Sequence, residues 1–282
     1  MLLLTTITGV RARRRDLRLQ GRTVALVPTM GAIHEGHLCL VDRARELADE
    51  VWATVFVNPT QFGPGEDFAH YPRDLEHDRA LLAGRGVALL FAPSDKEIYP
   101  RPSATVVDLP ELTAGLCGTF RPGHFRGVAL VVTKLLSIAQ PEWAVFGAKD
   151  WQQAAVIRRL VEDLNLPVRI EVAPTVREAD GLAMSSRNAY LDPDERRAAT
   201  VLIRALRAAE TAITSGERDG EAIRRVLTEV VASEPRAQLQ YAAVVDPDTL
   251  QELARIGRLA LLALAAHVGA TRLIDNLLVE VP

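Results

Sequence analysis

Residues 23–38 read TVALVPTMGAIHEGHL, a short apolar segment followed by a glycine-containing turn and two histidines. The apolar, β-branched run Thr23–Val27 is typical of a buried strand, and the apolar residues after His37 recur at helical spacing. A strand is therefore predicted to lead into a helix here. The start of a helix presents unpaired backbone N–H groups and the positive end of its dipole, which favour bound phosphate. His34 and His37 could donate hydrogen bonds to phosphate oxygens as charge shifts in a transition state.

A zinc site is an alternative interpretation of this histidine pair. The metalloprotease pattern places its two histidines four residues apart on one face of a helix. Here His37 follows His34 by three residues, with Gly36 between them. The spacing favours phosphate chemistry over zinc, and a helix start with two solvent-facing imidazoles is the remaining alternative.

The composition indicates a globular protein with one large domain or two. The chain has 282 residues, of which 48% are apolar and 24% charged, and its net charge is −3. Because no long block of one charge sign occurs, a nucleic-acid partner is not favoured. The small basic cluster at Arg11, Arg13, Arg14 and Arg15 is interpreted as the solvated face of a helix.

The sequence predicts a soluble cytoplasmic protein with no membrane partner. The longest apolar run, Leu259–Ala266, is much shorter than a membrane span. The segment Met1–Leu4 is too short for a secretory signal, and basic residues follow it instead of preceding it. Cys39 and Cys117 form no C-x-x-C motif, so we interpret them as free thiols in a reducing compartment, and Cys39 as a packing residue more readily than a nucleophile.

Strand-like and helix-like patterns alternate up to about residue 175. The predicted strands are 23–27, 51–57, 87–91, 143–146 and 168–172, and the predicted helices are 35–49, 74–84, 127–139 and 150–165. Alternation of this kind predicts an α/β domain with a doubly wound, Rossmann-like parallel sheet. Ligands of such sheets bind at the carboxyl ends of the strands.

The pattern changes near residue 190. Asp192 as a cap and Pro193 at the first position predict a long helix that ends near Ser215. A helix at 221–232 and strands at 238–245, 259–265 and 271–279 follow. We therefore predict domains at residues 1–178 and 179–282, the second a smaller α+β domain. The segment before residue 22 is weakly patterned, and no element is assigned to it.

Two polar motifs are ambiguous when each is considered alone. Asn58-Pro59-Thr60-Gln61-Phe62 follows the second strand, and its amides could bind hydroxyl and carboxylate groups, although a polar turn explains it as well. Arg121–Gly127 combines turn formers with cations just before an apolar helix. It could be an anion site, a lid or an exposed loop.

Two further motifs favour phosphate binding. A strand ends at Gly147, where the backbone can approach a ligand, and Lys149 then sits at a helix start, which is unfavourable for a cation unless an anion faces it. Gln153 lies one turn further on. The Met184–Asn188 segment combines two hydroxyls with a guanidinium and could clamp a phosphate, with a surface loop as the alternative. Taken together, the motifs predict a nucleoside triphosphate site beside a pocket for a small polar acid.

With these motifs in place, the chain closely resembles the pantoate–β-alanine ligase family through almost its whole length. Sister nucleotidyltransferases and class I aminoacyl-tRNA synthetases share the histidine motif and a serine-containing loop, but would not be expected to share Asn-Pro-x-Gln-Phe or Arg-Pro-Gly-His-Phe. The segments that carry the resemblance are Pro28–Val41, Phe56–Phe62, Arg121–Gly127, Phe146–Gln153, Ala179–Leu191 and Gly269–Asn276.

The resemblance implies a two-step ligase reaction. The carboxylate of pantoate attacks the α-phosphorus of ATP and expels pyrophosphate, and the amine of β-alanine then attacks the pantoyl adenylate and releases AMP. It also implies a requirement for Mg²⁺ and a homodimer. We further predict that the domain at 1–178 binds ATP and pantoate and that the domain at 179–282 closes over the site.

Residue roles follow from the same resemblance. It implies catalytic roles for His34, His37, Lys149 and Arg187. The implied ATP-binding residues are Met30, His37, Gly147, Ala148, Lys149, Asp150, Val176, Met184, Ser185, Ser186 and Arg187. The implied pantoate-binding residues are Pro28, Met30, Asn58, Gln61 and Gln153. Asp78 resembles an acidic position near the metal, although His77 stands where the family often has a second acid.

Two other functions are left open at this point. One is a related adenylyl-transferring enzyme that uses a different acid or nucleotide substrate. The other is a nucleotide-binding sensor without activity, against which Lys149 and the Ser-Ser-Arg sequence at 185–187 argue.

Overall fold

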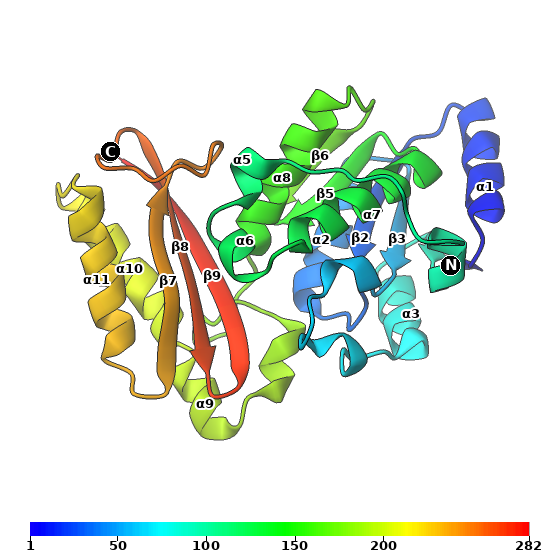
Figure 1. Ribbon diagram of the computed structural model, residues 1–282. Coiled ribbons are helices and arrows are strands. Elements are labelled where there is room, and N and C mark those ends of the chain that lie inside the picture. The colour runs from blue at the N-terminus through cyan, green and yellow to red at the C-terminus, as the bar shows by residue number, and fades with distance from the viewer. Residues whose placement is uncertain (282) are drawn as a thin grey trace. The chain divides into compact units, whose positions relative to one another are not determined.

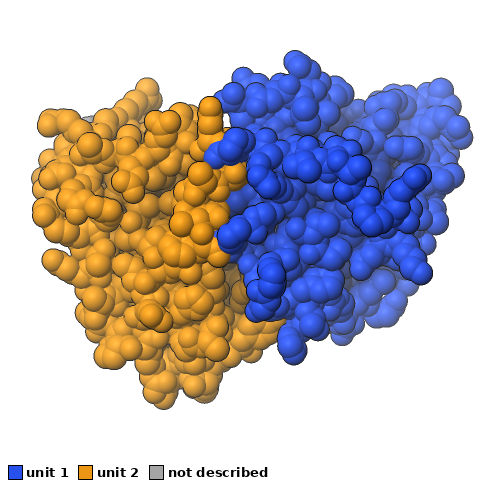
Figure 2. All heavy atoms as spheres, in the orientation of Figure 1, with its two compact units in different colours: residues 1–110, 121–148, 156–174 blue, residues 111–120, 149–155, 175–282 orange. Residues whose placement is uncertain are grey.

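The computed structural model describes residues 1–281 (Figure 1). The chain forms two compact units, which Figure 2 colours separately. Unit 1 contains residues 1–110, 121–148 and 156–174, and unit 2 contains residues 111–120, 149–155 and 175–282. The segments 111–120 and 149–155, which precede the predicted boundary at residue 178, thus group with the second unit. That boundary, and closure of residues 179–282 over a site, stay predictions.

Unit 1 is built on a six-stranded parallel sheet with the strand order β1-β4-β3-β2-β5-β6. Its strands are β1 (Leu2–Leu4), β2 (Val24–Thr29), β3 (Glu50–Val55), β4 (Leu89–Phe91), β5 (Trp143–Gly147) and β6 (Arg169–Ala173). The prediction of a doubly wound parallel sheet is confirmed. Strand β2 lies between β3 and β5. The chain continues from β2 to β3 and β4 on one side and later crosses to β5 and β6 on the other side. The β2–β5 junction is therefore the topological switch point, where such sheets bind ligands.

Helices cover both faces of this sheet (Figure 1). On one face, apolar residues of α1 (Ile7–Leu19), α7 (His124–Ala139) and α8 (Trp151–Asp163) join one core, and on the other face α2 (Glu35–Arg45) and α3 (Leu75–Gly84) join a second core. The short helices are η1 (Pro59–Gln61), η2 (Asp67–Ala69), α4 (Asp95–Ile98), α5 (Pro110–Thr113), α6 (Cys117–Phe120) and η3 (Ala148–Asp150). Among residues 1–281, no helix has both the length and the apolar character needed to cross a membrane.

The first 20 residues, which no sequence pattern placed, form β1 and α1. Strand β1 is only three residues long, so it shows no period, and its pairing with β4 places it in the sheet. The interpretation of the basic cluster as a solvated face is wrong for Arg14, whose side chain is 1% exposed. Arg14 is buried because its guanidinium has protein partners: its Nε donates to the Gln140 carbonyl at 2.8 Å, and it forms an ion pair with Glu142.

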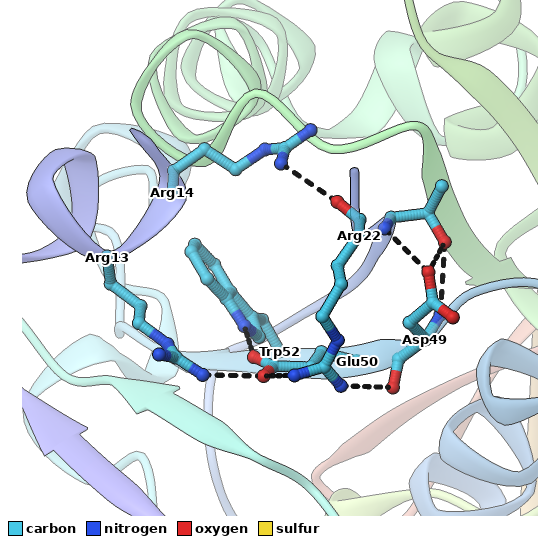
Figure 3. Close-up of polar contacts among 7 residues, drawn as sticks. Arg13, Arg14, Arg22, Asp49, Glu50 and Trp52 are labelled. Atoms are coloured by element: carbon cyan, nitrogen blue, oxygen red, sulfur yellow. Dashed lines mark hydrogen bonds and ion pairs between the residues drawn. The ribbon is translucent and has the colours of Figure 1, made fainter. Parts of the chain in front are cut away.

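Further arginines connect α1 and β2 to the amino end of β3 (Figure 3). The buried carboxylate of Glu50 accepts hydrogen bonds from Arg13 at 2.6 Å, from Arg22 at 3.0 Å and from the indole of Trp52 at 3.0 Å. This end of the sheet is opposite to the carboxyl ends of the strands. The cluster therefore supports the fold at a distance from the predicted ligand edge.

Unit 2 is built on an antiparallel sheet with the strand order β7-β8-β9. Its elements are η4 (Ser186–Tyr190), α9 (Pro193–Ala198), α10 (Val201–Thr214), α11 (Gly220–Ala232), β7 (Ala237–Val245), β8 (Leu259–Val268) and β9 (Thr271–Glu280). Helices α10 and α11 share one core with this sheet. A second apolar cluster joins Val245 and Leu261 of the sheet to Leu116 and Trp151. This packing explains why segments 111–120 and 149–155 belong to unit 2.

The predicted single helix from Pro193 to about Ser215 is wrong, because it is divided into α9 and α10. Asp192 caps α9 as expected, accepting from the backbone N–H groups of Asp194 and Glu195. Between the two helices, the N–H of Thr200 bonds to the Arg197 carbonyl and that of Leu202 bonds to the Ala199 carbonyl. These bonds span three residues instead of four, so the turn is tighter than an α-helix and interrupts it.

Candidate active site

The two histidines lie at the amino end of α2, directly after the carboxyl end of β2. His34 is the cap residue, and its Nδ1 accepts a hydrogen bond from the Gly36 N–H at 3.1 Å. The Nδ1 of His37 accepts from the His34 N–H at 3.4 Å, and the two ring centroids are 4.1 Å apart. Because Nδ1 acts as acceptor in each ring, the neutral tautomer carries its proton on Nε2. Each ring therefore has an Nε2–H donor, which suits an anionic ligand.

Asp78, from α3, anchors the loop that leads to His34. Its side chain is 1% exposed, and its two oxygens accept the N–H groups of Ala32 at 3.0 Å and Ile33 at 2.7 Å. Burial raises the pKa of the Asp78 carboxyl, and the two backbone hydrogen bonds act in the opposite direction. Gly31 has a φ of +86°, and a Cβ there would lie 2.8 Å from an Asp78 oxygen, so the loop fits closely around this carboxylate.

The Asp78 carboxylate is engaged in backbone hydrogen bonds. Both of its oxygens already accept backbone hydrogen bonds, and residues 1–281 contain no group of three or more His, Cys, Asp or Glu side chains that could hold a metal. The metal role of Asp78 stays a prediction. The contacts that the structure describes for this side chain are those of a loop anchor.

The Asn58–Gln61 motif lies at the carboxyl end of β3, and the side chains of Asn58 and Gln61 are buried. Asn58 Nδ2 donates to Gln61 Oε1 and to the Gly127 carbonyl, each at 3.1 Å. Gln61 Nε2 in turn lies 2.8 Å from the sulfur of Met30, on the loop after β2. Met30 and Gln61, both predicted to bind the acid substrate, are therefore in contact. The polar-turn interpretation also holds in part, because Asn58 caps η1 through the Thr60 N–H.

The Arg121–Gly127 segment is an ordered support for this motif. Arg121 binds Glu66 through two hydrogen bonds, Nε–Oε1 at 2.8 Å and Nη2–Oε2 at 2.6 Å. Arg121 Nη1 also lies 3.0 Å from His124 Nε2, and His124 Nδ1 lies 2.7 Å from the Gln61 carbonyl oxygen. Burial acts to raise the pKa of Glu66, but the hydrogen bond and the charge of Arg121 outweigh it and hold that pKa below its usual value. Glu66 neutralises Arg121, whereas Pro122, Gly123 and Arg126 are exposed, so the choice among an anion site, a lid and an exposed loop stays open.

Helix α7 approaches η1 so closely that only glycine fits at the contact. A Cβ on Gly127 would lie 2.2 Å from the Thr60 carbonyl oxygen and 2.6 Å from the Gln61 nitrogen. Both of these neighbours are backbone atoms, so a side chain at Gly127 would require η1 or α7 to move. The sequence singled out Gly127 only as the end of a motif. Glu66 and this close approach were not predicted, because they depend on residues far apart in the chain.

Lys149 and the adjacent residues are held by contacts within unit 2. The Nζ of Lys149 lies 3.9 Å from an Asp150 oxygen, and the Lys149 carbonyl accepts a hydrogen bond from the side-chain amide of Asn276 at 2.7 Å. The two neighbouring glutamines have different environments. Gln152 is buried and bonds to the backbone of Leu112, Gly115 and Cys117, whereas Gln153 is only half-buried.

The predicted phosphate clamp follows a short hairpin. Met184 donates its N–H to the Val176 carbonyl at 3.0 Å, so the predicted adenosine-side residue and the start of the clamp are adjacent. Ser185 caps η4, with its Oγ accepting the Arg187 N–H at 3.3 Å. The two serines and Arg187 are half-buried. The description of this segment as a plain surface loop is therefore incomplete, because a side-chain hydrogen bond gives its backbone a defined turn.

The candidate residues divide between the two units. Unit 1 contains Pro28, Met30, His34, His37, Asn58, Gln61, Asp78, Gly147 and Ala148. Unit 2 contains Lys149, Asp150, Gln153, Val176, Met184, Ser185, Ser186 and Arg187. Apart from Asp78, the candidate residues of unit 1 lie at or just after the carboxyl ends of β2, β3 and β5. The predicted location at the carboxyl ends of the strands is therefore confirmed for these residues. Their individual roles stay predictions.

The comparison with known families identifies the chain. The sequence model of the family described as pantoate-beta-alanine ligase matches residues 2–278. The chain belongs to the pantoate–β-alanine ligase family. It is 54% identical to the pantothenate synthetase of Heliobacterium modesticaldum over 281 residues, which cover 100% of both chains. It is also 54% identical to that of Moorella thermoacetica, covering 100% of this chain and 99% of the relative.

Solved structures show the same relationship. The pantothenate synthetase of Thermus thermophilus superposes with a TM-score of 0.93 at 48% identity, covering 98% of this chain and 99% of the other. The pantoate-beta-alanine ligase of Francisella tularensis, complexed with beta-gamma ATP and β-alanine, superposes with a TM-score of 0.82 at 34% identity, covering 99% of this chain and 97% of the other. The resemblance inferred from the motifs is confirmed, and the family is one of ligases.

Proposed function

We propose that this protein condenses pantoate with β-alanine at the expense of ATP, yielding pantothenate, AMP and pyrophosphate through a pantoyl adenylate. The observation that carries the proposal is the full-length family match, with relatives 54% identical over the whole chain. The substrate carboxylate is the nucleophile, so no protein nucleophile is required. Catalysis then depends on positioning the reactants and stabilising charge at the phosphorus.

In unit 1, His34 and His37 donate from Nε2 to ATP phosphates, a role that their Nδ1 contacts with the start of α2 support. Met30 and Gln61 line the pantoate site, and the Gln61 amide binds a hydroxyl or the carboxylate of the substrate. Pro28 and Asn58 complete this site, Asn58 chiefly by holding the Gln61 amide. Gly147 and Ala148 bind ATP where β5 ends.

In unit 2, Lys149 stabilises the developing charge at the α-phosphorus. The hydroxyls of Ser185 and Ser186 and the guanidinium of Arg187 bind the β- and γ-phosphates. Gln153 binds pantoate. Asp150, Val176 and Met184 are assigned to the adenosine side, which the Met184–Val176 hydrogen bond supports.

The proposal includes Mg²⁺, a homodimer and a cytoplasmic location. Because no three-residue ligand cluster occurs among residues 1–281, the protein offers no metal cage of its own. Mg²⁺ in phosphoryl-transfer sites is held largely by the substrate phosphates and water, and it would neutralise triphosphate charge there. The two cysteines are free thiols, consistent with a reducing compartment.

The decisive experiment is pantoate-dependent exchange of labelled pyrophosphate into ATP, with Mg²⁺ and without β-alanine. Exchange that requires pantoate would establish adenylate formation, and adding β-alanine should then give pantothenate and AMP. Absence of exchange in folded, ATP-binding protein would contradict the proposal. If another acid supported exchange, the substrate would be reassigned, whereas ATP binding without any pyrophosphate release would favour a sensor.

A substitution at Gly127 tests the support of the pantoate site. We expect Gly127→Ala to raise the KM for pantoate by about tenfold or more, because the added methyl group would displace η1 and with it the Gln61 amide. We expect the KM for ATP to change little, because unit 1's phosphate-binding histidines lie on a different loop. Overpacking should also lower stability by about 1–3 kcal/mol.

Gly84→Ala is the matched control for this change. Gly84 ends helix α3, and a Cβ there would meet nothing within 4 Å. We expect the control to have unchanged kinetics. Equal pantoate KM values for Gly127→Ala and the wild type would show that the contact between α7 and η1 does not position Gln61.

A further inference from the structure

Strand β9 carries a buried polar pair, Asp275 and Asn276, among apolar residues. The side chains are 1% and 8% exposed. Successive residues of a strand point to opposite faces of its sheet. Asp275 is opposite Leu264, a residue of the α10–α11 core, and Asn276 is opposite Ala263 on the other face. The pair can therefore hold segments that lie on different faces of the same sheet.

Asp275 anchors the hairpin that precedes the phosphate clamp. Its two oxygens accept hydrogen bonds from Arg177, Oδ2 from Nη1 at 2.7 Å and Oδ1 from Nη2 at 2.9 Å. The same guanidinium donates to the Gly181 carbonyl at 3.1 Å and to the Asn276 carbonyl at 3.2 Å. Two-point Arg–carboxylate pairing fixes orientation as well as distance. Since the hairpin continues directly into Ser185, this pairing sets where the clamp begins.

Asn276 anchors the segment that carries Lys149. Its side-chain Nδ2 donates to the Lys149 carbonyl at 2.7 Å. Its own backbone N–H donates to Asp275 Oδ1 at 2.8 Å, so the two anchors are connected. Lys149 and the clamp are 36 residues or more apart in the chain, and nothing local in the sequence relates their positions. Neighbouring residues of one rigid strand thus contact both segments.

We propose that Asp275 and Asn276 are positioning residues that fix Lys149 and the Ser185–Arg187 clamp relative to each other for binding of the triphosphate. The inference rests on the proposed function, because it assigns these two segments to ATP phosphates. Neither residue is assigned a contact with the reacting atoms. Each acts through a backbone or guanidinium contact, and a displacement of about 1 Å in such a support can reduce rate about 10²-fold.

The two half-reactions separate this role from a general structural one. Adenylate formation needs the β- and γ-phosphates to be held, whereas aminolysis of supplied pantoyl adenylate by β-alanine involves neither of them. We expect Asp275→Asn to raise the KM for ATP and slow pyrophosphate exchange by about 10- to 100-fold, with aminolysis changed less than about twofold. We expect Asn276→Ala to slow both half-reactions, because Lys149 faces the phosphate that remains in the adenylate.

Two further variants keep the test interpretable. Arg177→Lys retains the charge but loses the two-point pairing, and it should reproduce the Asp275→Asn phenotype if that variant folds poorly. Thr271→Val, also a buried polar position on β9, is the control and should have wild-type kinetics. The melting temperature of each variant reports folding separately.

The outcomes distinguish the inference from the proposed function. If the wild type shows no pantoate-dependent exchange, the proposed function fails. If the wild type is active but folded Asp275→Asn and Arg177→Lys keep its KM for ATP, the positioning role is wrong. It is also wrong if both half-reactions decline equally in Asp275→Asn, because that result indicates a general loss of structure.

Discussion

Lys149→Met is expected to reduce pantoate-dependent pyrophosphate exchange by about 10²–10³-fold. Methionine keeps the length of the apolar stem and removes the charge. Lys149 lies in η3, two residues before the start of α8, and the positive end of the helix dipole disfavours a cation near this position unless an anion faces it. Asp150 is 3.9 Å away and about half exposed, so it compensates the charge only weakly. The position of this lysine supports the proposed contact with phosphate.

The kinetic pattern distinguishes transition-state stabilisation from ground-state binding. We expect kcat to fall more than the KM for ATP rises, because negative charge at the α-phosphorus develops during the reaction. Lys96→Met, on the exposed surface of α4, is the control and should retain the wild-type rate. A rate within about tenfold of wild type for Lys149→Met would be inconsistent with the catalytic role, since one lost charge contact costs more than that.

Arg14→Met is expected to lower the free energy of unfolding by about 2–4 kcal/mol. The substitution removes the Arg14 donor of the Gln140 carbonyl and the ion-pair partner of Glu142. It also removes the hydrogen bond from Arg14 to the Arg22 carbonyl, which Figure 3 shows. Glu142 also accepts the Val24 N–H at 2.8 Å, so the pair connects α1 to the start of β2. Burial lowers the pKa of the Arg14 guanidinium, and the Glu142 charge opposes that effect. The expected loss in the free energy of unfolding is at the lower end of the range for a broken buried ion pair, because Glu142 is 38% exposed.

Urea denaturation of the wild type and the variant measures this change. The pantoate and ATP KM values of the folded variant should be unaltered, because Arg14 supports the amino ends of the strands, opposite to the ligand edge. Arg15→Met is the control, since Arg15 lies next to Arg14 in α1 and is exposed. A decrease below about 0.5 kcal/mol for Arg14→Met, similar to an ordinary surface substitution, would show that the buried pair contributes little.

The strands and helices that the sequence predicted well have strong local signals. β2 and β3 are short apolar runs rich in β-branched residues, and each lies within two residues of its predicted bounds. The helix start beside the histidines was predicted from the change of period alone, and α2 begins at Glu35 with His34 as its cap. These features depend on neighbouring residues, so one sequence suffices to detect them.

The features that were missed depend on contacts between distant residues. The contact of Asp78 with the loop before His34 was not predicted, because its hydrogen bonds go to backbone groups 45 and 46 residues earlier in the chain. Arg121 was left as an anion site, a lid or an exposed loop, because its partner Glu66 is 55 residues away. Arg14 was grouped with surface arginines, because its partner Glu142 is 128 residues away. In each case a local pattern shows the side chain but not its partner.

The sequence by itself determined the alternating α/β pattern, the family, and which motifs follow the strands at their carboxyl ends. All three depend on residue order and local period, which one chain displays directly. Only the tertiary structure decided that Lys149 belongs with unit 2, that Asp78 holds the histidine loop, and that Asp275 and Asn276 contact two separate candidate segments. The physical reason is that a buried polar group must find a partner, and folding supplies that partner from anywhere in the chain.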